Sequence, residues 1–473
     1  MKAQEKSAQI AALRAEIERK SAVGSGLSAR ERLSLLFDEG TFVEVGAFVR
    51  QRPTEFGCSD SAESVVTGYG AVDGVLVYAF AQDPAVNKGA ISEMHARKIK
   101  NIVHMAMKTD APLVSFLDSC GMNLGEGMDA LAGYGEILSL CSEMQGEIPH
   151  VCVVSGVCAG AMSFLPAFAD YTVVLKNAEL FLSAPSVVQA RYGEVTGDSA
   201  SAYASGLASA VCDTEAEAVG AVKAFLNFFG AVEPADDVNR LTDAIPALIS
   251  AENYDVSALI GQIADCGQMV EFAGGYAKNI VTGLIHLDGT PCGVVANQPA
   301  EKNGDLDAKA CDKAAKFIEF CDSYDIPVIT LVDTNGFAAE VGENISESAR
   351  LVAAYASSDA VKITLIVGKA YGAGYLSMGA KHTGADVVLA YPTAQIAALP
   401  ADTGAVFLCG KEISDSADPV ATREELIASY GETMASPLQA AQRGYVDDII
   451  DYETTRQLLI SSLNLFLQEG DGV

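Results

Sequence analysis

The chain of 473 residues lacks the residue patterns that mark several common kinds of functional site. Its eleven cysteines form no Cys-x-x-Cys pair, and its five histidines are scattered without the His-Glu-x-x-His spacing of a zinc enzyme. We therefore expect reduced, buried thiols and no metal site. No Gly-x-Ser-x-Gly, Walker or Gly-x-Gly-x-x-Gly motif follows a predicted strand, so the sequence contains no convincing nucleophile–base pair and no nucleotide-binding loop.

Basic residues are also scarce. The chain has 31 Lys and Arg against 62 Asp and Glu, a formal net charge of −31. This balance argues against nucleic acid and anionic membrane surfaces as partners, so an anionic ligand would need local bases or helix N-termini. The amino-terminal segment is a charged amphipathic helix, interpreted as a packing arm. It has no apolar signal core, and we expect a cytoplasmic protein.

One long segment, residues 151–169 (VCVVSGVCAGAMSFLPAFA), contains no charged residue at all. Its length is close to the roughly 20 residues of a membrane span. However, Ser155 and Gly156 lower its hydropathy, and Pro166 would interrupt a helix. We predict a strand over 151–154, a Ser-Gly turn and then a buried helix. Membrane span, buried core and active-site floor are the three interpretations at this point.

The chain contains an internal repeat. The segment VVTGYGAVDG (65–74) matches IVTGLIHLDG (280–289), and APLVSFLDSCG (111–121) matches IPVITLVDTNG (326–336), both at an offset of 215. Further pairs are residues 38–45 with 265–272, 92–108 with 307–323, Ala159-Gly160 with Ala373-Gly374, and 173–175 with 387–389. Matches in the same order predict two homologous domains, which we place at 1–240 and 241–473.

Each half alternates continuous apolar runs with helix-patterned segments. Residues 75–83, 112–118 and 150–156 read as fully buried strands, which predicts an α/β fold with a parallel sheet. Glycines at 121, 156 and 368 follow predicted strands, where α/β folds place their ligands. Ser28-x-x-Glu31 is a capping box before an apolar helix.

The two small-residue segments CAGAM (158–162) and YGAGY (371–375) offer mainly backbone for chemistry. Two N–H groups at a glycine turn that leads into a helix can hold a developing oxyanion, and small side chains let a carbonyl approach them. Two such turns indicate two carbonyls that become enolate-like. Close helix packing, which also favours Gly and Ala, is the alternative interpretation.

Several motifs in order resemble the biotin-dependent acyl-CoA carboxyltransferases, the group that includes the propionyl-CoA carboxylase β subunit. The first half contains DEGTFVEV, LDSCGMNLGEGMDALAGYGEI, SGVCAGAMSFLPAFAD and FLSAPSVV, and the second contains GGYAKNIVTG, KAYGAGYLSMGAKHTGADVVLAYPTAQIA and SPLQAAQRGYVDDIID. The resemblance covers roughly residues 28–465. It implies two tandem crotonase-like (ClpP/crotonase) domains, each with an oxyanion hole.

The resemblance also implies a reaction, which moves CO2 between carboxybiotin and the α-carbon of an acyl-CoA without a protein base. Gly160 and Ala161 would hold the thioester oxygen in the acyl-CoA domain, and Ala373 and Gly374 the biotin ureido oxygen in the second domain. Residues implied around the substrates are Cys120, Gly121, Ala159, Ser183, Ala184, Tyr371, Gly372, Tyr375 and Leu376.

No Met-Lys-Met biotin-attachment motif is present, so biotin is expected on a separate biotin carboxyl carrier protein. The implied partners are a biotin carboxylase or a membrane decarboxylase subunit, and the implied assembly is a homohexamer. Three functions stay open: the carboxyltransferase of an acyl-CoA carboxylase, the same subunit in a sodium-pumping decarboxylase, and a non-catalytic scaffold paralogue.

The chain departs from the family pattern at a few positions. The family's DSGGARIQEG reads DSCGMNLGEG here, so Met122-Asn123 stands where the arginine is expected. We therefore do not expect the polar or anion contacts that this arginine would make. The segment after DTNGF, residues 338–344, is shortened, so a different loop is expected on the biotin side. Leu376 lies in a region that lines the acyl pocket in the family, so the resemblance implies a small aliphatic or extended acyl group. The sequence contains no cysteine pattern of a zinc ribbon, so we expect no such module in it.

Overall fold

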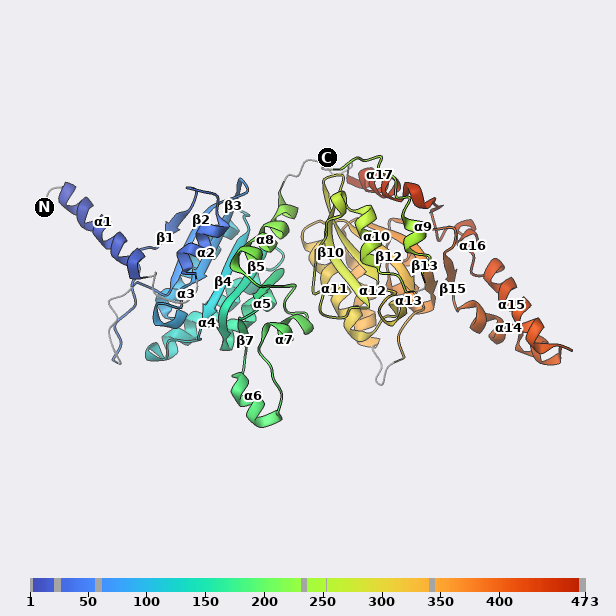
Figure 1. Ribbon diagram of the computed structural model, residues 1–473, viewed down its shortest axis with the longest axis horizontal. Coiled ribbons are helices and arrows are strands. Elements are labelled where there is room, and N and C mark those ends of the chain that lie inside the picture. Colours follow the sequence, from blue (N-terminus) through green and yellow to red (C-terminus); the bar gives the residue numbers. More distant parts are fainter. Residues whose placement is uncertain are drawn as a thin grey trace. The chain divides into compact units, whose positions relative to one another are not determined.

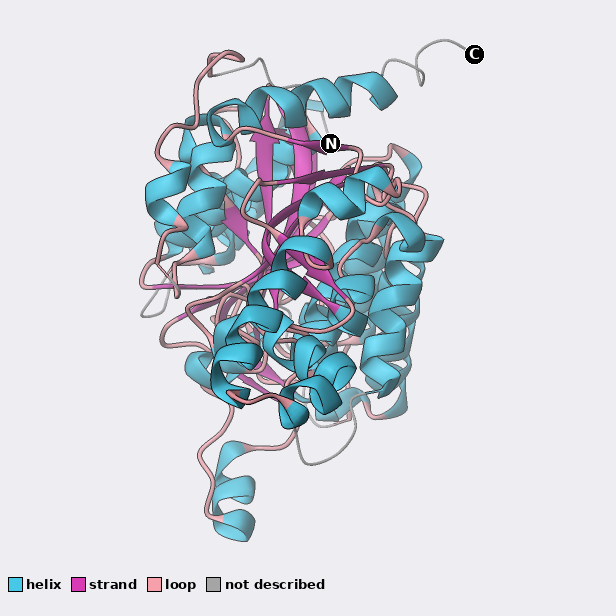
Figure 2. Ribbon diagram, turned by 90° about the vertical axis from the view of Figure 1, so that its right-hand side faces the viewer, coloured by secondary structure: helices cyan, strands magenta, loops and turns pink. Residues whose placement is uncertain are grey.

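The computed structural model describes residues 3–20, 27–55, 62–230, 236–251, 253–339 and 345–467. The chain divides into two compact units, 1–230 and 231–473, and each contains a β-sheet flanked by helices (Figure 1). Figure 2 distinguishes the helices of the two units from the strands by colour. The predicted α/β class is confirmed in both halves.

The first unit contains α1 (Ala3–Lys20), α2 (Ala29–Leu36), β1 (Val43–Val45), β2 (Val65–Val72), β3 (Val75–Gln82), α3 (Glu93–Lys108), β4 (Leu113–Ser119), α4 (Met128–Met144), β5 (His150–Ala159), α5 (Leu165–Phe168), β6 (Tyr171–Leu175), β7 (Glu179–Phe181), α6 (Pro185–Tyr192), α7 (Ser199–Ala204), β8 (Ala210–Cys212) and α8 (Glu215–Leu226).

The second unit contains α9 (Ile245–Leu248), α10 (Val256–Ile263), β9 (Val270–Glu271), β10 (Ile280–Leu287), β11 (Thr290–Asn297), α11 (Ala308–Ser323), β12 (Val328–Thr334), α12 (Ile345–Ser357), β13 (Lys362–Tyr371), α13 (Gly372–Ser377), β14 (Val387–Ala390), β15 (Gln395–Ala397), α14 (Ala401–Asp415), α15 (Pro419–Thr433), α16 (Pro437–Gln442), β16 (Asp448–Ile449) and α17 (Thr455–Leu467). Short 3-10 turns are η1 (Asn87–Gly89), η2 (Leu124–Glu126), η3 (Gly160–Phe164), η4 (Asn227–Phe229), η5 (Asp265–Gly267), η6 (Lys302–Gly304), η7 (Lys381–Thr383) and η8 (Tyr452–Thr454).

The two sheets have the same strand order. Within the described residues the first runs β1-β2-β3-β4-β5-β6-β8 with β7 beside β5, and the second runs β9-β10-β11-β12-β13-β14-β16 with β15 beside β13. In each, the first three strands are antiparallel and the following ones parallel. Identical connectivity confirms that the sequence repeat is a structural repeat.

Side-chain contacts repeat as well. The Asp38 carboxylate accepts hydrogen bonds from the N–H groups of Asp73 (3.1 Å) and Gly74 (2.9 Å) at the β2–β3 turn. Asp265 accepts the corresponding pair from the β10–β11 turn at 3.0 and 2.9 Å. The predicted matches of residues 38–45 with 265–272 and of the two hairpins are therefore correct. The capping box is also present, because Ser28 and Glu31 bond each other's backbone N–H groups.

Beyond β4 and β12 the predicted alignment needs correction. Asp118 accepts a hydrogen bond from the N–H of Val157, and Asp333 accepts one from Lys369, so β5 and β13 are related by 212 residues. The structural equivalent of Gly160 is thus Gly372. The pairing of Ala159-Gly160 with Ala373-Gly374 is wrong by two residues.

The predicted match of residues 173–175 with 387–389 is wrong by two residues in the opposite direction. Asp170 bonds the N–H of His150 at the start of β5, and Asp386 bonds the N–H of Lys362 at the start of β13. Val173 therefore corresponds to Leu389. The connection after β13 is four residues longer than the one after β5, and this insertion compensates an earlier deletion. An average offset conceals both changes.

The apolar segment 151–169 lies in the core of the first unit. The strand β5 continues through Ser155 and Gly156 to Ala159, so the predicted Ser-Gly turn is wrong. Gly156 instead allows close packing, because a Cβ there would lie 2.3 Å from an oxygen of the Asp118 carboxylate. After β5 come η3 and α5, with Pro166 in the first turn of α5. In the part of the chain that is described, no helix is long and apolar enough to cross a membrane.

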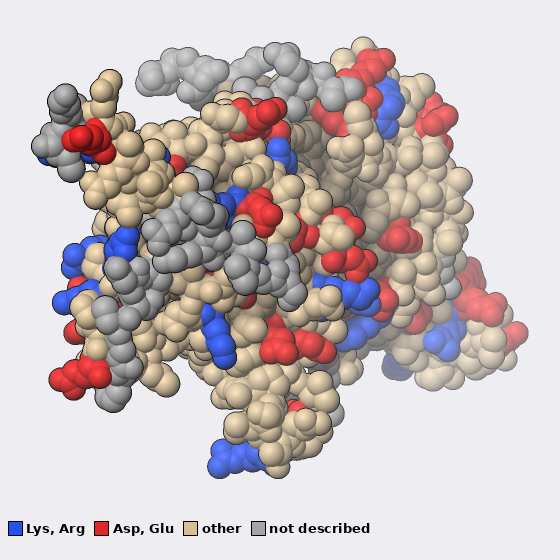
Figure 3. Space-filling model, turned by 60° about the vertical axis from the view of Figure 1, so that its left-hand side comes forward, with Lys and Arg blue, Asp and Glu red and all other residues tan. Residues whose placement is uncertain are grey.

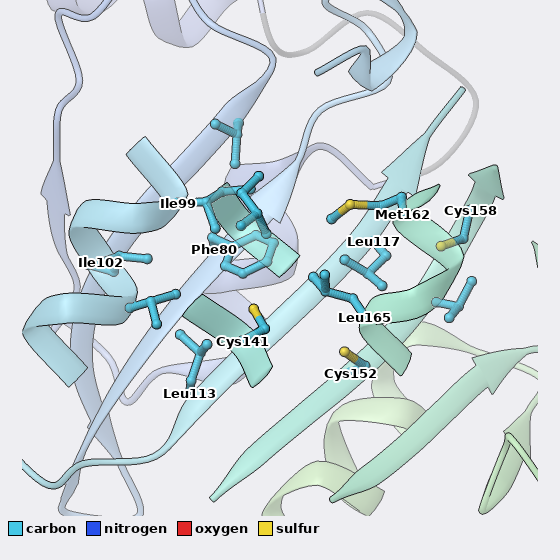
Figure 4. Close-up of a cluster of buried hydrophobic side chains, with 14 of the residues drawn as sticks. Phe80, Ile99, Ile102, Leu113, Leu117, Cys141, Cys152, Cys158, Met162 and Leu165 are labelled. Carbon is cyan, nitrogen blue, oxygen red and sulfur yellow. The ribbon is translucent and has the colours of Figure 1, made fainter. Parts of the chain in front are cut away.

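Helices α3 and α4 contribute buried side chains to the core of the first unit. Side chains of α3 and α4 meet one face, and Figure 4 shows Ile99 and Ile102 of α3 beside Phe80 of β3. Met162 and Leu165 extend the same cluster from the chain after β5. The turn after β5 is therefore anchored in the core. On the face shown in Figure 3, acidic side chains stand among neutral and basic ones rather than forming one patch.

Candidate functional site

Each unit has a strand-to-helix turn at the end of its longest strand. β5 ends at Ala159, and Gly160 (φ +67°) begins η3; β13 ends at Tyr371, and Gly372 (φ +52°) begins α13. Such positive φ values favour glycine. The first N–H groups of a helix have no acceptor within it. The first N–H groups of both turns are therefore candidate hydrogen-bond donors.

The first turn brings together the residues predicted in its half. Gly121 (φ +112°) lies against Ala159, whose carbonyl oxygen would be 3.9 Å from a Cβ at position 121. Cys120 beside it is exposed. Ala159 pairs with Phe181 at the end of β7, which places the exposed Ser183 and Ala184 just beyond the same edge of the sheet. A Cβ at Gly160 would meet nothing within 4 Å, so this turn is open.

The second turn is more enclosed. Tyr371 is buried, and its hydroxyl donates a hydrogen bond to Gln395 Oε1. A Cβ at Gly374 would lie 2.5 Å from Gly336 Cα, so this position requires glycine. Burial raises the pKa of Tyr375 to about 12, and within the described residues its hydroxyl has no hydrogen-bond partner. Leu376 is 39% exposed.

The residues at the expected arginine position make contacts within their own segment and with the core. Met122 packs on the core cluster, and the Asn123 side chain accepts a hydrogen bond from the N–H of Gly125 at 3.1 Å, which caps η2. The arginine position is therefore taken by a turn-forming side chain. Most of the shortened segment 338–344 lies outside the described residues.

A buried ion network lies behind the first turn, and the sequence reasoning missed it. Arg32 of α2, 4% exposed, donates to Asp118 Oδ2 at 3.0 Å and to Glu215 Oε1 of α8 at 2.8 Å. Glu215 also accepts a hydrogen bond from the Ser155 hydroxyl at 3.3 Å. The repeated Asp118 and Asp333 were a signal for this site, but the partners are distant in sequence.

In the second unit the equivalent carboxylate has different partners. Asp333 accepts hydrogen bonds from the Tyr254 hydroxyl (3.1 Å) and from the N–H of Lys369 (2.9 Å). Burial raises the pKa of Asp333. No arginine reaches it among the described residues, and a cavity of about 480 Å³ adjoins it.

Two buried lysines occupy equivalent places in the two units. Lys98 Nζ donates to the carbonyl of Val65 at 2.6 Å, and Lys313 Nζ donates to that of Ile280 at 2.9 Å. Burial lowers the pKa of each ammonium group to about 8. Lys98 therefore links α3 to the first residue of β2, and Lys313 links α11 to the first residue of β10.

The arrangement suits catalysis by preorganised backbone donors rather than by a side-chain nucleophile. Among the described residues, no three His, Cys, Asp or Glu side chains gather as metal ligands do.

Comparison with known proteins agrees with the family resemblance found in the sequence. The Carboxyl transferase domain model matches residues 23–470. The chain is 39% identical to the methylmalonyl-CoA decarboxylase subunit alpha of Propionigenium modestum, covering 95% of this chain and 92% of that one. It is 37% identical to the propionyl-CoA carboxylase beta chain of Cereibacter sphaeroides, covering 91% and 89%.

Among solved structures, transcarboxylase 12S with methylmalonyl-coenzyme A bound superposes with a TM-score of 0.94 at 35% identity, covering 99% of this chain and 96% of that one. The family and the two-domain crotonase-like fold predicted from the sequence are thereby confirmed. The chain belongs to the carboxyl transferase family and is a biotin-dependent acyl-CoA carboxyltransferase.

Proposed function

We propose that the chain is the carboxyltransferase component of an acyl-CoA carboxylase that acts on a small acyl group of the propionyl-CoA and methylmalonyl-CoA type. The observation that carries this proposal is the pair of equivalent glycine turns, one at the end of β5 and one at the end of β13. One turn for each carbonyl matches a reaction in which two carbonyl groups become enolate-like.

In this proposal the first unit binds the acyl-CoA and the second binds biotin. The N–H groups of Gly160 and Ala161 hold the thioester oxygen. In the second unit Ala373 is the structural equivalent of Ala161, so its N–H is the main donor to the ureido oxygen, with Gly374 beside it. Small residues at both turns fit this approach of a carbonyl to the backbone.

Bound carboxybiotin would supply the CO2 and the base for the α-proton, which agrees with the lack of a nucleophile–base pair among the described residues of either turn. The protein's own contribution is to orient both carbonyls and stabilise their developing charge. Asp118 and Asp333 support this role from behind, because each bonds the backbone two residues before the end of β5 or β13.

We further propose a cytoplasmic homohexamer that receives biotin from a separate carrier protein and works with a biotin carboxylase. Transcarboxylase 12S, a hexamer, is similar over 99% of this chain, which supports the assembly. Light scattering at micromolar concentration tests it, and a fully active monomer would contradict it.

The decarboxylase direction is a second candidate, because the alpha subunits of two methylmalonyl-CoA decarboxylases, from Propionigenium modestum and Veillonella parvula, are 39% and 37% identical to this chain. Its partner would be a membrane decarboxylase subunit. The purified protein should be incubated with free biotin and malonyl-, methylmalonyl- or glutaconyl-CoA. Decarboxylation of one thioester identifies the acyl group, whereas no reaction with any of them would favour a non-catalytic scaffold.

A further inference from the structure

The second unit contains a cavity of about 480 Å³ next to Asp333. This volume falls within the roughly 300–1,000 Å³ of small-molecule pockets. Its polar wall includes Ser250, Tyr254, Asp333, Lys369, Thr393, Gln395 and Tyr452, and Pro246, Ile249 and Val367 contribute apolar surface. None of these residues belongs to either glycine turn.

The cavity lies on the face of the sheet that carries α10. Leu331 and Val367 pack in the core cluster with the side chains of α10. The β12–β13 register shifts between Val332 and Thr334, and Asp333 and Lys369 line the cavity together with Val367. The helix α13, which follows the second glycine turn, contacts α12 instead. None of residues 371–376 of the proposed biotin site lines the cavity, although Gln395 of its wall bonds Tyr371.

The hydrogen-bond acceptors of the wall are largely engaged. Both oxygens of Asp333 accept hydrogen bonds, and Gln395 Oε1 accepts one from Tyr371. The hydroxyls of Thr393 and Tyr452 bond each other at 2.8 Å. What remains is an excess of donors, the Lys369 ammonium group and the Gln395 Nε2 amide. The charge of Lys369 acts on Asp333, but within the described residues neither donor makes a hydrogen bond or a close ion pair.

The corresponding region of the first unit indicates which charged groups can lie beside Asp333. There a cation, Arg32, lies between two carboxylates, Asp118 and Glu215. In the second unit the cation is Lys369, and Asp333 is the one carboxylate among the described residues that line the cavity. The turn before α17 contributes Tyr452 instead of a second carboxylate. The second unit thus has a cation, one carboxylate and an open space.

We propose that this cavity binds a small organic carboxylate, whose oxygens are held by Lys369 and Gln395 and whose apolar part contacts Ile249 and Val367. The bound carboxylate takes the role that Glu215 has in the first unit. Gln395 also bonds Tyr371, the last residue of β13, so the ligand contacts the support of the second turn.

The test measures binding of sodium propionate and sodium malonate to the full-length protein by saturation-transfer NMR, against sodium chloride at equal ionic strength. We expect saturable binding of at least one probe. Lys369→Met should weaken it at least 10-fold, whereas Lys411→Met, which removes an exposed lysine on α14, should leave it unchanged. Excess free biotin should not displace the probe, because the glycine turns are not involved.

A second variant, Ile249→Trp, fills the cavity without changing its charge and should also abolish binding. The proposal is overturned if neither probe binds saturably, if Lys369→Met and Ile249→Trp both fold and bind normally, or if biotin displaces the probe. Neither readout depends on carboxyl transfer, so failure here is distinct from failure of the proposed function.

Discussion

The first and second units have the same sheet and differ most behind their glycine turns. In the first, Asp118 is held by Arg32, which also binds Glu215. In the second, Asp333 is held by Tyr254 beside an open cavity. The backbone contacts that position the turns are the same in both units, whereas the side chains behind them have diverged. The turn geometry therefore does not require the ion network.

The largest loss of stability is expected from removing Arg32, the cation of the first unit. Arg32→Met leaves the buried Asp118 and the partly buried Glu215 without their cation, and breaking a buried pair in this way costs about 3–5 kcal/mol. Urea unfolding followed by circular dichroism measures the loss. The double variant Arg32→Met/Glu215→Leu should lose less than the two single changes together, because one of the uncompensated charges is gone. A loss below about 1 kcal/mol for Arg32→Met would mean that the network contributes little.

The next effect concerns the turns themselves. Ala161→Pro removes a backbone donor at a position where proline is tolerated, near the start of a helix. We expect a folded variant whose kcat falls about 10²–10³-fold, equivalent to roughly 2.7–4 kcal/mol, with a much smaller change in KM. The matched variant Ala161→Gly keeps the donor and should keep most activity.

Ala373→Pro makes the same change at the second turn and tests whether the two turns share a role. Thermal melting on the same preparations separates lost donors from lost packing. A well-folded Ala161→Pro protein with unchanged kcat would end the oxyanion interpretation of the first turn.

A smaller loss of stability is expected from removing the hydrogen bond between Tyr254 and Asp333 in the second unit. Tyr254→Phe removes one hydrogen bond to the buried carboxylate of Asp333, and a hydrogen bond to a charged group contributes about 1.5–3 kcal/mol. We expect a loss near the lower end of this range, because the cavity can admit water to Asp333. Tyr445→Phe, at an exposed position, is the control and should change stability little. An effect as large as that of Arg32→Met would mean that the two carboxylates are equally sensitive.

The smallest effect is a change in the pH dependence of stability, and it tests the buried lysines Lys98 and Lys313 that the two units share. The pKa of Lys98 is about 8 in the folded protein, below its unfolded value near 10.5, so the unfolded chain binds more protons between these values. Stability from this group therefore rises with pH across that window, by about 1 kcal/mol per pH unit. Urea unfolding at pH 8.5 and 9.5 should show a smaller rise in Lys98→Met than in the wild type. Lys313→Met should behave alike, and an unchanged pH dependence in both would contradict the lowered pKa values.

Much of the fold could be predicted because it rests on local patterns. Buried strands, the capping box at Ser28 and the repeated hairpins follow from residue periodicity and from short motifs. The glycine turns were recognisable because a positive φ and a close backbone approach demand small residues at fixed places.

Exact equivalences between the halves could not be predicted. A deletion before β5 and an insertion after it cancel in the sequence offset, and the hydrogen bonds of Asp118 and Asp333 were needed to separate them. Gly156 was interpreted as a turn because a lone glycine has several uses, and the nearby carboxylate that explains it comes from another strand.

The sequence by itself determined the class of the fold, its duplication, its family and the two turns that present backbone donors. Only the tertiary structure decided what lies behind those turns. Arg32 meets Asp118 and Glu215 across 86 and 183 residues of chain, and the cavity beside Asp333 depends on how distant side chains fill space. Local patterns record the conformation of neighbouring residues, whereas ion networks and cavities depend on packing between segments that only the folded chain brings together.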